Sequence, residues 1–199
     1  MNTHTAGHDV EARTFHLITP ISDETIKRLH VGDVVYVSGA IFTARDMAHR
    51  RILEEKPAWT NEIRSGVVYH CGPIVKNGTV VSAGPTTSAR LNTLTPDFLA
   101  LTGAKLLIGK GGMDENVLRA LEEHTAAYGV FPGGSGALAA KSLRRKKVYL
   151  EDLGMPEAVW VFEARDFGPV FITMDAHGNS LHQEVEKTVK DNLLRLFSP

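Results

Sequence analysis

The order of the predicted strands and helices constrains the fold of this chain more than any other feature. Strands and helices alternate in the middle of the chain, whereas consecutive strands are predicted near both ends. A purely parallel, doubly wound fold would not place three strands in a row. We therefore predict an α/β fold with a mixed sheet and a second, smaller sheet. The predicted strands cover residues 14–19, 33–38, 67–71, 79–82, 105–108, 147–150, 159–164 and 169–174.

The predicted helices begin at recognisable capping residues. Ser22 can cap a short helix, and Thr43 and Asp46 have the spacing of a capping box, with Asp where Glu or Gln is usual. Ser180 and Gln183 form a capping box for a final helix with apolar residues along one side. The strands at 67–71 and 79–82 are predicted to be joined through Lys76-Asn77-Gly78, where the Asn-Gly pair marks a turn. Further helices are predicted at residues 44–54, 96–101, 113–128 (closed by Gly129) and 137–143.

The charge and cysteine content exclude several classes of function. The chain has 199 residues and a net charge of -1, which creates no general attraction to nucleic acid or to an anionic membrane. Any specificity for an anion must therefore be local. Cys71 is the one cysteine, which excludes a disulfide framework and a zinc or iron–sulfur site built on the thiolates of this chain alone.

The N-terminal residues 1–12 are polar and lack the apolar region of a secretory signal. We predict a loose tail there, followed by one domain over residues 13–199. No run of residues is long and apolar enough for a transmembrane helix. The low cysteine content fits a reducing compartment, so we predict a cytoplasmic protein.

The segment after residue 82 carries the first candidate site for an anion. Gly84-Pro85 forces a turn, and Thr86, Thr87 and Ser88 supply three consecutive hydroxyls next to free backbone N–H groups. Arg90 follows Thr86 by four residues, which would place both on one face of a helical turn. A hydroxyl, a guanidinium and helix N-terminal N–H groups together suit a carboxylate or a phosphate. The alternative is an N-cap with a solvated arginine.

A second glycine-rich turn, Gly109-Lys110-Gly111-Gly112, joins a strand to a helix. It lacks the spacing of a Walker A loop, and no acidic partner on a second βαβ unit supports a dinucleotide site. Lys110 at the carboxyl end of a strand can still pair with a ligand in the crevice at that edge. The alternative is an ordinary turn between a strand and a helix.

The third candidate is the start of the helix predicted after Thr43. Arg45 lies in its first turn, where a cation opposes the helix dipole and an anionic ligand would offset the repulsion. His49, four residues later, is a candidate proton donor or hydrogen-bonding group. The alternative is a surface arginine and a histidine satisfied by Asp46.

Three further motifs favour structure over chemistry. The loop at residues 132–136 is a possible anion nest, but Ala137 stands where a nucleophile elbow around Ser135 needs glycine. Asp175 and His177 belong to a turn pattern more typical of structure than of a metal site. The basic residues 144–147 are interpreted as the solvated end of a helix and not as a nucleic-acid site.

Taken together, these motifs resemble a known family. The chain is similar to the β subunit of two-subunit class I fumarate hydratases and L-tartrate dehydratases, and to the C-terminal domain of the one-chain class I fumarases. The resemblance runs from about Leu17 to the end of the chain. The motifs that carry it are residues 39–49, 84–90, 109–112, 153–158 and His177-Gly178-Asn179.

The resemblance implies a swivelling β/β/α domain and a partner α subunit. That subunit would hold a [4Fe–4S] cluster through three cysteines, with one iron open to the substrate hydroxyl. A heterotetramer of α2β2 type is the expected assembly. Cys71 receives no ligand role, and Ser135 stands where some relatives have a cysteine.

The resemblance also implies roles for individual residues. Arg45, Arg90 and Lys110 would bind the substrate carboxylates, with Thr86 and Thr87 as hydroxyl groups beside them. Thr86 is the candidate base or proton relay. Because a threonine alone is a poor base, it would need an acidic partner from the α subunit or a neighbour such as Asp46 or His49.

We therefore predict the β subunit of an Fe–S hydro-lyase that reversibly hydrates fumarate to (S)-malate. The first alternative has the same mechanism with L-tartrate or mesaconate as the substrate. The second alternative is a dicarboxylate-binding module without catalytic activity. On either hydro-lyase hypothesis, the isolated chain should be inactive and should expose an apolar or glycine-rich surface.

Overall fold

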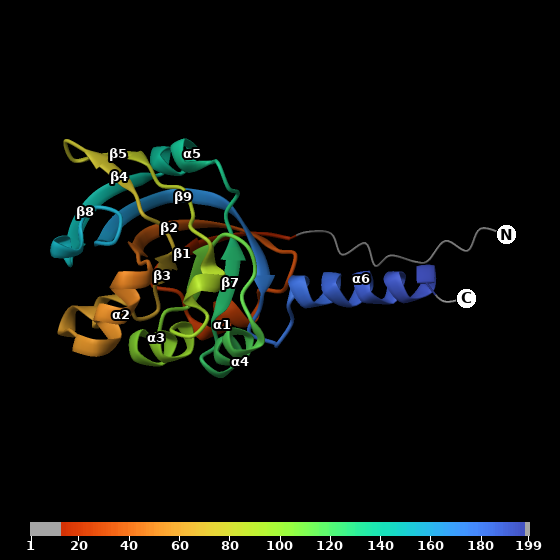
Figure 1. Cartoon of the computed structure of the whole chain (residues 1–199). Coiled ribbons are helices and arrows are strands. Elements are labelled where there is room, and N and C mark those ends of the chain that lie inside the picture. The colour runs from red at the N-terminus through yellow and green to blue at the C-terminus, as the bar shows by residue number, and fades with distance from the viewer. Residues whose placement is uncertain (1–12, 198–199) are drawn as a thin grey trace.

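The computed structural model describes residues 13–197, which build a seven-stranded mixed sheet (Figure 1). The strand order is β1-β2-β3-β6-β7-β9-β8. Strand β9 also pairs with β2, so that β2, β3, β6, β7 and β9 close into a barrel. The bounds are β1 Thr14–Ile18, β2 Val34–Thr43, β3 Val67–Tyr69, β6 Leu106–Gly109, β7 Ala127–Val130, β8 Leu143–Tyr149 and β9 Val159–Met174. The predicted α/β fold with a mixed sheet is confirmed.

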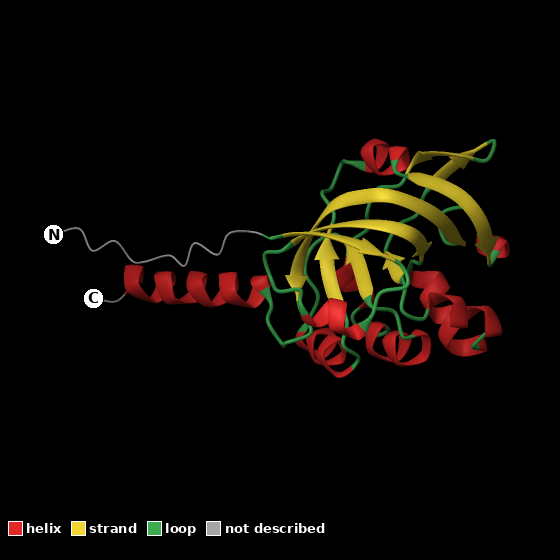
Figure 2. Ribbon diagram, turned by 180° about the vertical axis from the view of Figure 1, so that it is seen from behind, coloured by secondary structure: helices red, strands yellow, loops and turns green. Residues whose placement is uncertain are grey.

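The second, smaller sheet is also confirmed. It is a hairpin of β4 (Ile74–Lys76), which was not predicted as a strand, and β5 (Thr79–Ser82). Asn77 and Gly78 form its turn with positive φ angles of 51° and 76°, as the Asn-Gly signal predicts. The predicted connection of the strand at 67–71 to the strand at 79–82 is therefore wrong, because β3 pairs with β2 and β6 instead. The hairpin lies beside α5 (Gly136–Lys141), on the side of the barrel away from α2, α3 and α4 (Figures 1 and 2).

Helices α1 (Asp23–Lys27), α2 (Asp46–Glu55), α3 (Thr95–Thr102) and α4 (Glu115–Glu123) lie on the outside of the barrel. Short 3-10 helices occupy Ala58–Ile63, Ser88–Leu91 and Glu151–Leu153. The central strands bury both of their faces, since Val67 and Tyr69 join one apolar core and Val68 joins a second core with the helices. Because both faces are buried, the sequences of these strands are continuous apolar runs.

The helix predicted over residues 113–128 is too long. Helix α4 ends at Glu123, Thr125 takes a positive φ of 49°, and the chain then enters β7. Gly129 lies inside this strand and does not close a helix. A Cβ on Gly129 would lie 2.5 Å from a methyl group of Val170, so the closeness of β9 requires glycine at this position.

The basic residues 144–147 lie in strand β8 and not at a helix end, so that prediction is wrong. Helix α5 ends at Lys141, and β8 begins at Leu143. Strand β8 pairs with β9 at one edge of the sheet. Charged side chains are a common way to protect such an edge from further pairing. The strands predicted at 159–164 and 169–174 are one continuous strand, β9, that bends along the barrel.

Two of the three predicted caps are wrong. Ser22 caps α1 as predicted, because its Oγ accepts from the Thr25 N–H at 3.2 Å. Thr43 instead ends β2, and its buried hydroxyl accepts from the Trp160 N–H at 3.0 Å, so Arg45 is the N-cap residue of α2. Ser180 makes no side-chain hydrogen bond to any residue in the described part of the chain, which removes its predicted capping box.

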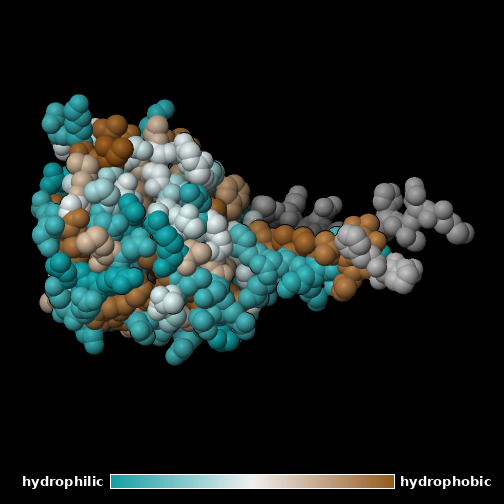
Figure 3. All heavy atoms as spheres, in the orientation of Figure 1, coloured by the Kyte–Doolittle hydropathy of each residue, from teal (hydrophilic) through white to brown (hydrophobic). Residues whose placement is uncertain are grey.

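Helix α6 (Leu181–Phe197) extends away from the barrel (Figures 1 and 2). Its predicted apolar stripe is present, and Figure 3 shows it as a continuous brown band. Val185, Val189 and Leu193 are each 54% exposed. The chain therefore exposes an apolar surface, as expected. None of the helices described here has the length and apolar character needed to cross a membrane. The predicted tail at residues 1–12 lies outside the described residues.

Candidate functional site

The loops that carry the predicted site leave the barrel at one edge. Strands β2, β3, β6 and β7 are mutually parallel and their registers align, so their carboxyl ends lie together. Arg45 follows β2, His70 follows β3 and Lys110 follows β6. The crevice outside the carboxyl ends of parallel strands is where α/β folds generally bind their ligands. The tertiary structure therefore gathers three segments that are distant in sequence.

The segment after β5 crosses this edge and pairs with the loop after β6. The Thr86 N–H donates to the His70 carbonyl at 2.7 Å, and the Lys110 N–H donates to the Thr86 carbonyl at 3.1 Å. The Ser88 N–H donates to the Lys110 carbonyl at 3.0 Å. These three backbone N–H groups are thus already used, and the prediction that they are free to bind an anion is wrong. A ligand at this edge would be bound mainly by side chains.

Arg90 connects the Thr86 segment to helix α2. Its Nη2 donates to Thr86 Oγ1 at 2.7 Å and to Asp46 Oδ2 at 3.1 Å. The predicted proximity of Thr86 and Arg90 is therefore confirmed, although Thr86 precedes the 3-10 helix instead of opening it. The guanidinium is about half exposed, so it can also reach a ligand from solvent.

Arg45 faces a carboxylate that sequence reasoning did not assign. Its Nε lies 3.2 Å from Glu157 Oε1, close enough for an ion pair but at an angle that makes no hydrogen bond. We treat the contact as an ion pair, because Coulomb attraction depends on distance more than on angle. Glu157 Oε2 also accepts from the Met47 N–H at 3.0 Å, at the N-terminus of α2. Glu157 belongs to the family motif at residues 153–158, and this motif was the sequence signal that could have identified it.

Glycine at position 72 makes room for the Arg45 side chain. A Cβ on Gly72 would lie 2.7 Å from Arg45 Nη1 and 2.8 Å from the Pro156 carbonyl oxygen. Neither separation is compatible with a normal contact, and the carbonyl belongs to the backbone. Gly72 therefore permits Arg45 to lie between two loops, although the sequence alone does not mark it as special.

Lys110 is exposed and has no ion-pair partner within residues 13–197. Its aliphatic chain lies near Gly133, where a Cβ would be 3.5 Å from Lys110 Cδ. The arginine site, defined here as Arg45, Asp46, Thr86, Arg90 and Lys110, thus contains three cations. Asp46 and Glu157 neutralise two of them, which leaves one positive charge for an anion.

The three consecutive hydroxyls do not face the same way. Thr86 is half-buried and Thr87 is exposed, so both can meet a ligand. Ser88 is fully buried, and its Oγ lies 2.8 Å from His70 Nδ1. Only two of the three hydroxyls are therefore available at the surface of the site.

His49 and His70 are buried beneath the arginine site. His49 Nδ1 lies 2.9 Å from the Arg45 carbonyl oxygen, so Arg45 and not Asp46 satisfies this ring. Burial lowers the pKa of His49 to about 4, against smaller opposing effects of the Arg45 carbonyl and Asp46. Burial, and then the proximity of His49, also lowers the pKa of His70. Both rings are neutral at pH 7. Of the two roles considered for His49, its position favours hydrogen bonding over direct proton donation.

The remaining candidate residues have structural surroundings. Ser135 donates its hydroxyl hydrogen bond to the Pro132 carbonyl within its own loop. Cys71 is buried, and burial raises its pKa. Asp175 Oδ1 accepts from the N–H groups of His177 and Asn179, which confirms a structural turn. Among the residues that the structure describes, no three His, Cys, Asp or Glu side chains are grouped to hold a metal ion.

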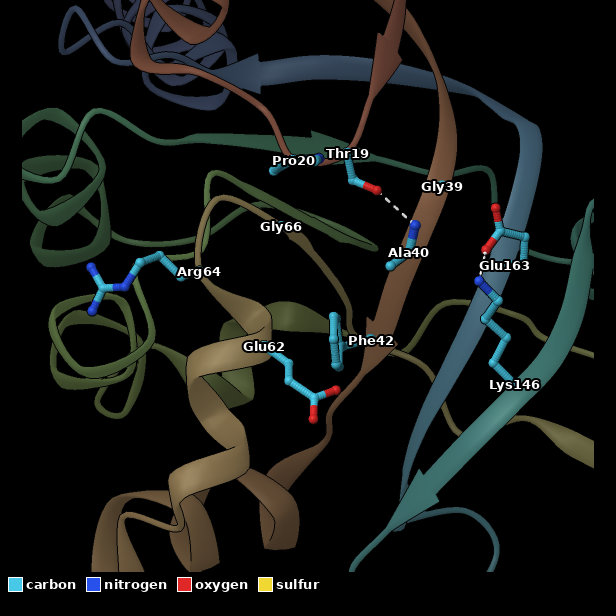
Figure 4. A pocket seen from close by; sticks show the side chains of 10 residues that line it. All are labelled: Thr19, Pro20, Gly39, Ala40, Phe42, Glu62, Arg64, Gly66, Lys146 and Glu163. Atoms are coloured by element: carbon cyan, nitrogen blue, oxygen red, sulfur yellow. Dashed lines mark hydrogen bonds and ion pairs between the residues drawn. The ribbon is translucent and has the colours of Figure 1, made fainter.

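A separate hollow lies between β2, β9 and β8 and contains none of the predicted site residues (Figure 4). Thr19, Gly39 and Glu163 line it. Lys146 and Glu163 form an ion pair at one side of it, and the Thr19 hydroxyl accepts from the Ala40 N–H at 2.6 Å. Its polar groups are thus largely satisfied by each other.

Comparison with known proteins gives a consistent picture. Residues 1–185 match the family model described as Fumarase C-terminus. The chain is 42% identical over 195 residues to "Putative L(+)-tartrate dehydratase subunit beta" of Methanocaldococcus jannaschii, covering 92% of this chain and 97% of that protein. It is 40% identical to the L(+)-tartrate dehydratase subunit beta of Escherichia coli strain K12, covering 86% and 88%. It is 38% identical to "Putative fumarate hydratase class I" of Geobacillus stearothermophilus, covering 98% of this chain and 39% of that protein.

Proposed function

The chain belongs to the fumarase C-terminus family, and on this premise we propose that it is the β subunit of a hydro-lyase that reversibly adds water to fumarate to give (S)-malate. The observation that carries the proposal is the arginine site. Three cations lie on loops at the carboxyl ends of parallel strands, and one of their charges is not neutralised. The free cation supplies the attraction that a carboxylate requires, and Arg45 and Arg90 offer guanidinium groups for the hydrogen bonds of a second one.

We assign the substrate carboxylates to Arg45, Arg90 and Lys110. A guanidinium can grip a carboxylate through two parallel hydrogen bonds, and Lys110 adds a point charge. Thr87 is exposed next to this group, since it pairs with Lys110 through the backbone. Binding both ends of the substrate would fix the double bond relative to Thr86, which is how positioning contributes to rate.

Thr86 is the proposed proton relay, with Asp46 as its supporting acid. Arg90 donates to Thr86 Oγ1, which leaves the hydroxyl proton of Thr86 free to point at a ligand. A neighbouring guanidinium also favours negative charge on that oxygen. Asp46 contacts the same Arg90, so it orients the guanidinium and thereby Thr86. The acidic group that finally accepts the proton would come from the partner subunit.

The proposed cofactor is a [4Fe–4S] cluster on a separate α subunit. Cys71 is fully buried and, within the described residues, belongs to no group of His, Cys, Asp or Glu side chains that could hold a metal, so it offers no anchor for the cluster. When bound, the cluster would supply a Lewis acid for the substrate hydroxyl. Relatives named "subunit beta" support a partner of this kind. An α2β2 assembly and a cytoplasmic location stay predictions.

L-tartrate is the second candidate substrate, and a specific observation favours it. Both two-subunit relatives described above carry names of tartrate dehydratases. Loss of water from tartrate would give oxaloacetate through the same carboxylate contacts. Purified α/β enzyme should be assayed on fumarate, L-tartrate and mesaconate, and the highest kcat/KM identifies the substrate. Failure on all three would contradict the proposed function.

The rival of a different class is a binding module that senses a dicarboxylate without catalysis. It predicts micromolar binding of a dicarboxylate by the isolated chain and a native complex without iron. The hydro-lyase proposal predicts iron in that complex and no turnover by the isolated chain. In the reconstituted enzyme, Arg90→Ala should abolish turnover, and retained activity would contradict the proposal.

A further inference from the structure

A polar cluster lies directly under the arginine site and has no role in the chemistry proposed so far. It comprises His49, His70 and Ser88, all of which are fully buried. The two imidazole rings meet edge to face, with their centroids 5.4 Å apart. Burying polar groups is unfavourable unless hydrogen bonds compensate. Core packing alone therefore does not explain why these three polar side chains are buried.

Each histidine is attached to a different loop of the site. His49 Nδ1 lies 2.9 Å from the Arg45 carbonyl oxygen, at the start of α2. Because a carbonyl only accepts, the Nδ1 of His49 carries the proton. His70 holds the Thr86 segment twice. Its carbonyl accepts from the Thr86 N–H at 2.7 Å, and its Nδ1 lies 2.8 Å from Ser88 Oγ.

The loop after β6 also leaves space for this arrangement. A Cβ on Gly109 would lie 1.8 Å from Ser88 Oγ and 3.1 Å from His70 Nδ1. Any other residue at position 109 would displace the serine from the histidine. The first glycine of Gly109-Lys110-Gly111-Gly112 therefore serves the contact between His70 and Ser88, in addition to the turn that presents Lys110.

We propose that His49 and His70 are positioning residues that hold Arg45 and Arg90 at the spacing a dicarboxylate requires. His49 fixes the backbone of Arg45, His70 fixes the segment from Thr86 to Arg90, and the two rings pack against each other. This inference rests on the proposed function, because it assigns the two arginines to the two ends of one substrate.

A second connection between the same loops exists at the surface but is weaker. Arg90 contacts Asp46 across them at 3.1 Å, with both side chains substantially exposed. Exposed ion pairs contribute little, and a bound carboxylate would compete with Asp46 for the same guanidinium. The buried histidine pair is the connection that stays intact when substrate binds.

The test uses the complete α/β enzyme and variants with little change in volume. Ser88→Ala removes the partner of His70 Nδ1 and should raise KM for the dicarboxylate about tenfold, with kcat changed less than about threefold. His70→Leu should raise KM at least as much. His70→Asn keeps an amide at the Nδ1 position and should stay within about threefold of the wild-type KM.

Thr102→Val is the matched control. Thr102 has a buried hydroxyl that donates to the Phe98 carbonyl at 2.7 Å, but it precedes the amino end of β6, whereas Lys110 follows the carboxyl end. The control should lose stability without a change in KM. If Ser88→Ala and His70→Leu change KM no more than Thr102→Val does, the histidines only fill the core and the inference is wrong.

Two measurements on the isolated full chain keep this test separate from the proposed function. The ¹⁵N NMR spectrum of His49 should show the tautomer protonated at Nδ1. Hydrogen exchange at the Thr86 amide should accelerate in Ser88→Ala and not in Thr102→Val. The opposite tautomer, or unchanged exchange, overturns the positioning role. An α/β enzyme inactive on all three dicarboxylates overturns the proposed function instead, whatever these spectra show.

Discussion

Two charged regions of this molecule, the hollow of Figure 4 and the arginine site, differ in how their charges are balanced. The hollow of Figure 4 has a volume of about 440 Å³, enough for a small organic ligand. Three of its four charged lining residues are paired, since Lys146 contacts Glu163 and Glu62 contacts Lys147 from outside the hollow. The fourth, Arg64, points away from it. The arginine site instead contains three cations, two of which are paired with Asp46 and with the adjacent Glu157.

From this difference we expect unbalanced charge, rather than the size of a hollow, to mark the ligand site. At Arg45 and Arg90 a ligand must share each guanidinium with a protein carboxylate. An unneutralised cation at the carboxyl ends of parallel strands has no such competitor. The same contrast predicts which substitutions should affect activity and which should not.

The largest effect is expected for Arg45→Ala in the α/β enzyme. Removing this guanidinium loses a contact with the substrate and leaves the carboxylate of Glu157 unpaired beside it, where it repels a dicarboxylate. We expect kcat/KM to fall about a thousandfold, or about 4 kcal/mol. The double variant Arg45→Ala/Glu157→Gln should have a kcat/KM about tenfold higher than Arg45→Ala alone. No recovery would contradict the role given to Glu157.

The next effect concerns the pH dependence of stability, to which the buried His49 beneath the arginine site contributes. The pKa of His49 is lowered from 6.5 to about 4 by burial, so the unfolded chain binds a proton first as the pH falls. The contribution of the neutral ring to the free energy of unfolding is complete above pH 6.5. It is lost between pH 6.5 and 4, to a total of about 3 kcal/mol. The free energy of unfolding, measured with urea, should fall less between pH 7 and pH 4 in His49→Gln than in the wild type. Equal losses would contradict the lowered pKa.

Lys110→Met should have a smaller effect on the same site. Methionine keeps most of the aliphatic length beside Gly133 and removes only the exposed charge. We expect KM for the dicarboxylate to rise about tenfold, which corresponds to about 1.4 kcal/mol, and the increase should shrink at high salt. A KM unaffected at every ionic strength would remove Lys110 from the site.

The smallest effect is expected in the hollow of Figure 4. Lys146→Ala breaks an exposed ion pair with Glu163, which contributes at most about 1 kcal/mol to stability. We expect kcat and KM to stay within about twofold of wild type. A tenfold loss of activity would show that the hollow, and not the unbalanced charge, marks the functional region.

Local signals in the sequence predicted much of this molecule. The four-residue spacing of Thr86 and Arg90 predicted their contact, and Asn77-Gly78 predicted the hairpin turn. Strand β7 escaped prediction because its residues continue the apolar pattern of α4, and only pairing with β6 and β9 makes them a strand. The strand predicted at 147–150 covers only the end of β8, and residues 143–146 escaped because basic residues suit a helix end equally well.

By itself, the sequence determined the α/β class, the turn at Asn77-Gly78, and the cations and hydroxyls available to bind an anion. Tertiary structure decided which of them are gathered at one edge of the barrel and which are buried. Glu157 reaches the start of α2 from 110 residues away, and Ser88 turns inward to His70. The first contact depends on the pairing of β2 with β9, and the second on the pairing of β3 with β6 and of Thr87 with Lys110. Local spacing cannot specify them, because they join segments that only the packed strands bring together.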